Sequence, residues 1–147
     1  MHIETTRFGP MQIDERTILH FPDGLLGFPD SKNYIIFEHD QEAPFKWLQA
    51  TDEAALAFVI MDPFLLLPDY QVEIQEQDLQ ELRVGDTRHL SIFVLLTIPA
   101  GQPARMTANL KGPVLVNGEN RWAKQLVLTN SQYHTRHPLL ATPDTAG

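Results

Sequence analysis

The sequence predicts an all-β fold with one or two short helices, arranged as an antiparallel β-barrel-like single domain. About ten short apolar or alternating runs are separated by turn residues at regular spacing, a pattern typical of antiparallel barrels and sandwiches. Between them the sequence lacks the long helical stretches that a βαβ fold would require. A chain of 147 residues suits one domain and can bury a core without disulfide bonds. We expect this domain to span residues 1–140 and residues 141–147 to form a flexible C-terminal tail.

The first half of the chain alternates strand-like runs with turns that contain Pro and Gly. In Pro22-Asp23-Gly24, Pro presets φ and Gly permits a positive φ, so a turn follows the first run. Apolar and polar residues alternate at Tyr70-Gln71-Val72-Glu73-Ile74, as they do in a half-buried strand. The strands expected in this half are residues 17–21, 34–38, 46–51, 56–61 and 70–74.

The second half is expected to open with a short helix, from about residue 77 to residue 83. Leu79 and Leu82 lie three positions apart and therefore share one helical face, and Gly85 ends the run. The continuously apolar run Ile92-Phe93-Val94-Leu95-Leu96 is typical of a central strand that is buried on both faces. The strands expected after the helix are residues 91–98, 105–110, 113–116 and 122–128.

Negative charge is concentrated in the middle of the chain. The net charge is −8, yet residues 38–86 contain twelve acids and only two bases, Lys46 and Arg83. Direct binding to a nucleic-acid backbone requires clustered Lys and Arg, so the acidic segment disfavours it. The same segment would attract a basic protein partner. The alternative interpretation is a solvated face that only keeps the protein soluble.

The side chains that catalysis would require do not form a recognisable set. The absence of Cys excludes a disulfide scaffold, a thiolate zinc site and a Cys nucleophile. The six His residues are scattered, and the pair His134 and His137 lacks a third ligand close in sequence. No Gly-x-Ser-x-Gly elbow and no phosphate-binding Gly loop occurs. We therefore expect a protein that is not an enzyme and that binds no cofactor and no metal.

The sequence also lacks signals for export and for membrane insertion. The N-terminus has no apolar signal core. The longest apolar run, residues 54–61, is far short of the roughly 20 residues that cross a bilayer. We expect a cytoplasmic protein without membrane contact.

Two apolar segments are candidates for contact with another protein. Residues 44–64 contain the densest strand-like pattern, which favours either a rigid binding surface or core strands. Leu25 and Leu26 lie between Gly24 and Gly27, and two adjacent leucines in a turn are not easily buried together. Core-capping by this turn is the favoured interpretation, and an exposed apolar knob formed by one of the two leucines is the alternative.

Several motifs, taken in order, resemble the flagellar assembly factor FliW family. Each is weak alone, but the ordered set is specific and covers about residues 15–140. The motifs are Phe21-Pro22-x-Gly24-Leu25-Leu26-Gly27-Phe28, Pro44-Phe45-x-Trp47-Leu48-Gln49, Leu56-Ala57-Phe58, Asp62-Pro63, Pro68-Asp69-Tyr70, Thr97-Ile98-Pro99, Asn109-Leu110-x-x-Pro113-x-x-Val116-Asn117, Lys124-Gln125 and Tyr133-x-x-Arg136-His137-Pro138-Leu139.

This resemblance implies a cytoplasmic, non-enzymatic protein with two partners. One is newly made flagellin, and the other is CsrA, a basic dimer that represses translation of flagellin mRNA. Once flagellin is exported, the free factor would bind CsrA and relieve the repression. In the family this antagonism is allosteric, because the factor does not occupy the RNA-binding surface of CsrA, which implies no direct binding of nucleic acid.

The residues suggest one surface for each implied partner. The acids Glu73, Glu76, Asp78 and Glu81 are the first candidates for CsrA binding, because they lie in the most acidic segment. For flagellin we expect an apolar contact that includes Leu25, Leu26 and Phe28. Two other classes stay open: a small-ligand-binding β-barrel without catalysis, and an undetected enzyme, which would need titratable groups that converge in a cleft. The sequence leaves open the oligomeric state and whether the two partners exclude each other.

Overall fold

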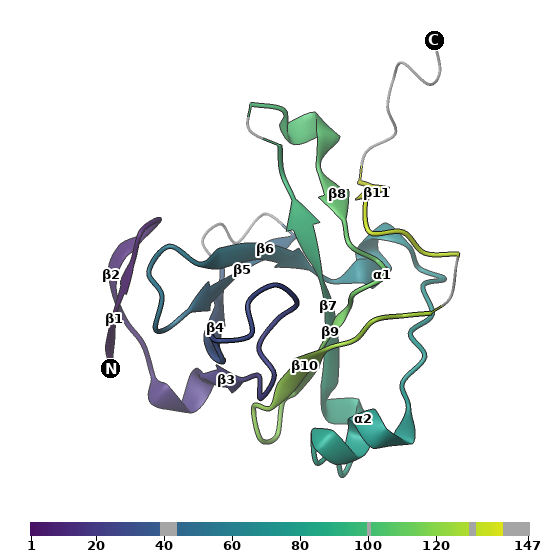
Figure 1. Cartoon of the computed structure of the whole chain (residues 1–147), viewed down its shortest axis with the longest axis horizontal. Coiled ribbons are helices and arrows are strands. Elements are labelled where there is room, and N and C mark those ends of the chain that lie inside the picture. The colour runs from purple at the N-terminus through teal and green to yellow at the C-terminus, as the bar shows by residue number, and fades with distance from the viewer. Residues whose placement is uncertain (39–43, 100, 130–131, 140–147) are drawn as a thin grey trace.

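The computed structural model describes residues 1–38, 44–99, 101–129 and 132–139, so the predicted tail lies outside the described residues. The chain is mostly β, with antiparallel ladders and two short α-helices, as the sequence predicts (Figure 1). One sheet runs in the order β10–β9–β7–β6–β5–β4–β3; β8 also pairs with β7, and β11 pairs with β8. The strands of this sheet are β3 (Leu19–His20), β4 (Asn33–Phe37), β5 (Phe45–Ala50), β6 (Ala57–Met61), β7 (Leu90–Thr97), β8 (Thr107–Ala108), β9 (Val114–Asn117), β10 (Ala123–Gln125) and β11 (His137–Pro138).

An N-terminal hairpin, formed by β1 (His2–Thr5) and β2 (Gly9–Gln12), makes the second sheet. The sequence does not predict it, because its strands are short and only partly apolar. Its turn is closed by the Thr5 hydroxyl, which donates to the Gly9 carbonyl at 2.8 Å. The Phe8 ring meets Trp47 of the large sheet edge-on, with ring centroids 5.2 Å apart. The hairpin therefore packs on the large sheet through an aromatic contact.

The central strands bury side chains on both faces, because two hydrophobic clusters lie on opposite sides of them. Side chains alternate between the faces of a strand, and the neighbours Ile60 and Met61 of β6 belong to different clusters. In β7, Val94 lies in the first cluster, and Leu95 packs against the second. This arrangement explains the continuously apolar run in β7 and confirms the prediction of a central strand.

The predicted barrel does not form. Within the described residues the two ends of the sheet meet at a parallel bridge between His20 and Trp122, where the His20 N–H donates to the Arg121 carbonyl at 2.8 Å. β3 is only two residues long, and Pro22 follows soon after it, so no ladder extends from this bridge. The sheets stay open, and β10 is an edge strand. The open sheet therefore does not support the alternative of a small-ligand-binding β-barrel.

The two α-helices have local sequence causes. Helix α1 (Pro63–Leu66) begins with Asp62 as its N-cap and Pro at its first position, a start signal that was present in the sequence. Helix α2 (Glu76–Glu81) confirms the predicted helix within two residues at each boundary. Its last carbonyls are capped from another part of the chain, because the Asn117 and Asn120 amides both donate to Leu82 O. Three 3₁₀ turns complete the described elements: η1 (Glu15–Thr17), η2 (Thr87–His89) and η3 (Pro103–Arg105).

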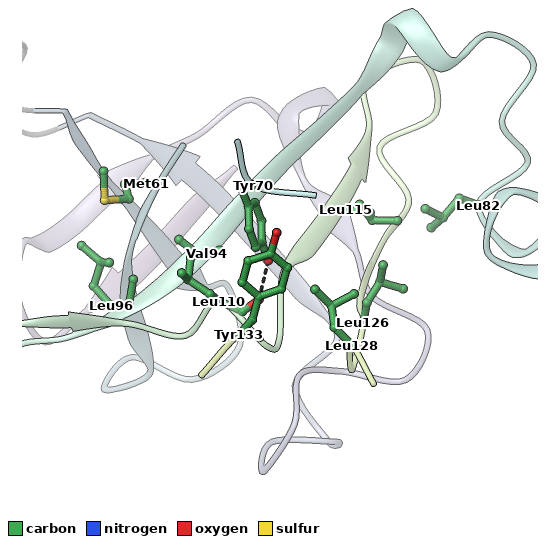
Figure 2. Close-up of a cluster of buried hydrophobic side chains, with 11 residues drawn as sticks. Met61, Tyr70, Leu82, Val94, Leu96, Leu110, Leu115, Leu126, Leu128 and Tyr133 are labelled. Atoms are coloured by element: carbon green, nitrogen blue, oxygen red, sulfur yellow. Dashed lines mark hydrogen bonds between the residues drawn. The ribbon is translucent and has the colours of Figure 1, made fainter. Parts of the chain in front are cut away.

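The strand predicted at residues 70–74 is wrong, although its alternation is right. Val72 and Ile74 are half-buried against the first cluster, while Glu73 is exposed, but no neighbouring strand pairs with this segment among the described residues. The first cluster, shown in Figure 2, holds the segment in place at its start. There the Tyr70 and Tyr133 rings meet edge-on at 4.8 Å, and the Tyr70 hydroxyl donates to the Leu110 carbonyl. Burial, together with the nearby Tyr133, raises the pKa of Tyr70.

Candidate protein-binding groove

The four predicted acids divide into two kinds once their contacts are known. Asp78 is 8% exposed and accepts a hydrogen bond from the Gln75 N–H at 2.9 Å, which caps the start of α2. Lys124 donates to Asp78 at 2.7 Å and to Glu81 at 2.6 Å. Asp78 therefore has a structural role, because it caps α2 and binds Lys124, and Glu81 forms an ion pair with Lys124.

The hydrogen bonds around Lys124 favour the charged forms of Lys124 and Glu81. Burial alone would lower the pKa of Lys124, but the hydrogen bonds to Asp78 and Glu81 outweigh it and raise that pKa. The hydrogen bond from Lys124 lowers the pKa of Glu81. The other two acids, Glu73 and Glu76, are exposed and form no ion pair within the described residues. The group has four carboxylates against one ammonium, so its charge is negative.

The Leu25–Leu26 turn separates its two leucines, so core-capping, the interpretation favoured from the sequence, holds for Leu25 only. The N–H and carbonyl groups of Leu25 and Phe28 bond to each other, so Leu26 and Gly27 form the tip of a tight turn. Gly27 adopts a φ of 87°, and Gly24, just before the turn, a φ of 66°. Leu25 is 2% exposed and belongs to the second cluster, whereas Leu26 is 58% exposed. Leu25 is therefore a core residue, and Leu26 is the exposed knob.

The exposure of Phe28 lies between those of Leu25 and Leu26. It is 41% exposed, and its ring meets the ring of Phe58 on β6 edge-on at a centroid distance of 5.4 Å. The Leu26 N–H donates to the Gln125 side chain of β10 at 2.9 Å, which fixes the turn on the edge of the sheet.

A groove along β10 connects the Leu26 turn with two of the four acids, Glu73 and Asp78. Three hollows of about 210, 270 and 310 Å³ follow one another, and neighbouring hollows share lining residues. The first lies between residues 23–29 and the pair Lys124 and Gln125. The second and third lie between residues 124–129 and the extended segment 71–75, with Asp78 on the wall. We call this feature the β10 groove. In Figure 1 the segments 71–75 and 126–129 lie on the side of the molecule opposite the β1–β2 hairpin.

One wall of the groove is an extension of β10. The β9–β10 ladder pairs Gln125 with Val114, and the same register continues when Leu126 N–H donates to Pro113 O and Leu128 N–H to Lys111 O, both at 2.8 Å. Pro113 has no N–H to return to Leu126, so the regular ladder stops there although the chain stays paired. The strand predicted over residues 122–128 is therefore confirmed only over Ala123–Gln125, and the chain beyond it continues with hydrogen bonds on one edge.

A separate hollow of about 340 Å³ lies on the sheet beside the hairpin. Trp47, Val59 and Leu96, which face one another across β5, β6 and β7, form its floor together with Ile98. The guanidinium of Arg7 lies 5.0 Å from the Trp47 ring centroid and covers one side. The segment 44–64 therefore contributes core residues such as Leu48, Ala50 and Ile60, while Trp47 and Val59 are half-buried and line this hollow.

Among residues 1–38, 44–99, 101–129 and 132–139, no group of three or more His, Cys, Asp or Glu side chains is arranged to hold a metal ion. His20 bonds to the Asn33 side chain at 3.1 Å, and His89 lies 3.1 Å from Glu119. His39 lies outside the described residues. In the same described part, no helix is long and apolar enough to cross a membrane.

Comparison with known proteins identifies the family. A family model described as FliW protein matches residues 2–139. The chain belongs to the FliW family. The flagellar assembly factor FliW of Alkaliphilus metalliredigens is 42% identical over 141 residues, which cover 95% of this chain and 86% of that protein. The protein of the same name from Leptospira interrogans serovar Lai is 40% identical over 140 residues, 95% and 93% of the two chains.

The fold agrees with that of a solved FliW. A crystal structure of the flagellar assembly factor FliW superposes with a TM-score of 0.88 at 32% identity, and covers 97% of this chain and 99% of that one. FliW proteins are assembly factors of the flagellum and not catalysts, so this chain is a non-enzymatic flagellar assembly factor. Its functional site is therefore to be sought among surfaces that bind proteins.

Proposed function

We propose that this FliW family member binds flagellin in the cytoplasm and, when free of flagellin, binds the translational regulator CsrA and antagonises it allosterically. Relief of CsrA repression would then couple flagellin synthesis to flagellin export. The observation that carries the proposal is the β10 groove, which places an acidic wall and an exposed apolar knob side by side on a protein of this family.

The proposed CsrA surface is formed by Glu73, Glu76, Asp78 and Glu81. Glu73 and Asp78 line the groove as its acidic wall, and Glu76 and Glu81 lie in helix α2 beside it. Glu73 and Glu76 are exposed and have no cation beside them in the described structure, so they can pair with a basic partner. Asp78 and Glu81 contribute in another way, since they fix Lys124 and α2 in place. The negative field would accelerate the encounter with CsrA and would weaken with salt, since the Debye length is about 8 Å at physiological ionic strength.

The proposed flagellin surface is the turn at Leu25, Leu26 and Phe28. Leu26 and Phe28 supply the contact, because their exposed apolar area would be removed from water in a complex. Leu25 supports them from the core. Because Gln125 both holds the Leu26 turn and lines the acidic part of the groove, the two surfaces adjoin. A large partner on one would therefore hinder access to the other.

Antagonism without contact with RNA requires a difference in affinity between two states of CsrA. The factor can only shift CsrA by as much as it prefers one state, and RNA must prefer the other. The acids of the groove could also lower RNA affinity by repelling the RNA phosphates through space.

Gel filtration of purified components tests the proposal. The chain, flagellin and CsrA are mixed in pairs and all together, and we expect two binary complexes, with flagellin displacing CsrA. The double variant Glu73→Lys and Glu76→Lys should weaken CsrA binding by at least about tenfold at low salt. Asp78 and Glu81 are left intact in it, so that Lys124 keeps its partners.

Its matched control is Glu4→Lys with Glu15→Lys, which changes the net charge equally on the hairpin side of the molecule. If both double variants bind CsrA alike across a salt titration, the acidic wall is not the CsrA surface. For flagellin, Leu26→Asp should abolish the binary complex in a protein that remains folded. Unchanged flagellin binding by that variant would remove the turn from the interface.

A further inference from the structure

The β10 groove contains a stretch of backbone that is built like a strand but paired on one edge only. In an extended chain, successive N–H groups point to opposite edges. Leu126 and Leu128 direct their N–H groups to Pro113 and Lys111. The N–H groups of Val127 and Thr129 therefore point to the other edge, and neither bonds to any described residue.

The earlier part of this edge is already covered. The Arg121 carbonyl, which lies on it, accepts the His20 N–H at 2.8 Å, and the Gln125 side chain holds the Leu26 turn beside it. No described segment pairs with this edge beyond Gln125. From Val127 onward the edge borders the hollows that separate it from the segment 71–75. Val127 itself is 61% exposed, an unusual position for an apolar side chain on an uncovered strand edge.

The opposite wall decides which strand would fit. Glu73 lines both hollows, and Asp78, with Lys124 paired to it, lines the first. Within the described residues the backbone N–H groups of Val72, Glu73 and Ile74 also make no hydrogen bond. An incoming strand would thus meet unpaired backbone N–H groups on both walls, and on the wall opposite Val127 also the carboxylate of Glu73. Val127 would offer it an apolar contact.

We propose that the Val127–Thr129 edge accepts an extended, basic segment of a partner protein as an additional antiparallel strand. Backbone hydrogen bonds to Val127 and Thr129 provide the binding, and Lys or Arg at alternate positions of the segment pair with Glu73. The proposal rests on the proposed binding of CsrA, and we assign the segment to that basic partner.

A proline substitution tests the backbone contact without breaking the fold's own hydrogen bonds. Val127→Pro removes an N–H that points to the free edge, whereas the N–H groups of Leu126 and Leu128 remain. Val127→Ala is the matched control, because it shortens the side chain but keeps the N–H. With purified CsrA as the probe, Val127→Pro should raise Kd about tenfold or more, and Val127→Ala by less than about threefold.

Amide hydrogen exchange on the unmodified chain gives a second measurement that does not depend on how the proline variant folds. Addition of CsrA should slow exchange at Val127 and Thr129, and leave the hairpin amides of β1 and β2 unchanged. If CsrA binds but these two amides exchange as before, or the folded proline variant binds as well as the alanine variant, strand docking is wrong and the proposed function stands. Protection by flagellin instead of CsrA would also overturn it. If CsrA does not bind the unmodified chain, the proposed function itself fails.

Discussion

Replacement of Lys124 by Met should destabilise the protein, because it removes a cation from two carboxylates while nearly keeping the length of the side chain. The Lys124 and Asp78 side chains are 21% and 12% exposed, so this contact is shielded from water, whereas the Glu81 side chain is 44% exposed. A shielded hydrogen bond to a charged group is worth about 1.5–3 kcal/mol. A pair as exposed as Glu81 with Lys124 is worth about 0.2–1 kcal/mol. Together they predict that Lys124→Met lowers the free energy of unfolding by about 3 kcal/mol.

Urea denaturation followed by far-UV circular dichroism measures this change, and thermal denaturation should show a fall in Tm of roughly 10 °C for a chain of this length. Lys32→Met is the control, because Lys32 is exposed and its side chain contacts no acid in the described structure; it should change stability by less than about 0.5 kcal/mol. Equal effects of the two substitutions would refute the reasoning.

The same pair predicts a pH dependence. The pKa of Glu81 is lowered in the folded state by the hydrogen bond from Lys124. A carboxyl with a depressed pKa stabilises the fold above its unfolded pKa, and this contribution is lost as pH falls through the folded pKa. The difference in stability between the unmodified chain and Lys124→Met should therefore shrink in acid, below the ordinary glutamate range. A difference in stability that stays constant as the pH falls below that range would contradict the assignment.

Three further predictions concern the turn and the core. Leu25→Ala should lower the free energy of unfolding by about 2–5 kcal/mol and Leu26→Ala by less than about 0.5 kcal/mol, and equal losses in urea denaturation would contradict the division between core residue and knob. Gly24→Ala would place a Cβ 2.4 Å from a carbonyl oxygen across the turn, whereas the Cβ of Gly27→Ala meets nothing within 4 Å. Gly24→Ala should therefore lower the free energy of unfolding by clearly more than the roughly 1 kcal/mol expected for a positive φ alone. Similar Tm values for the two variants would count against this geometry. Burial, with the charges of Asp52 and Glu53, raises the pKa of Tyr34 to about 12, and its buried hydroxyl has no hydrogen-bond partner among the described residues. Tyr34→Phe should therefore leave the free energy of unfolding unchanged or raise it by about 1 kcal/mol, and should reduce the loss of stability above pH 10. Marked destabilisation by this substitution in urea denaturation would show that the hydroxyl is paired.

Local patterns in the sequence predict most of the strands because the central sheet is formed from consecutive antiparallel neighbours. The runs at residues 34–38, 46–51 and 56–61 become β4, β5 and β6 within one residue at each end. Closure of the sheet depends instead on where the first and last strands meet, and β3 meets Trp122 at a single described bridge. Alternation alone also cannot tell a paired strand from residues 70–74, which lie extended on a core without a neighbour.

The candidate site was predictable in part. Charge density and the glycines beside Leu25 and Leu26 indicate the acidic wall and the turn. Which acid is free is not visible in the sequence, because Lys124 reaches Asp78 and Glu81 across more than forty positions of chain. The free edge at Val127 was also missed. Its one sequence signal is Pro113, which ends the β9–β10 ladder from the other side.

Strand β7 determines how the protein unfolds. It pairs with β6, β8 and β9, and its successive side chains enter both hydrophobic clusters. Neither cluster can open fully while β7 stays in place, and its loss removes a wall from both. We therefore expect the two halves of the core to melt in one cooperative transition, with the β7 amides exchanging only through global unfolding.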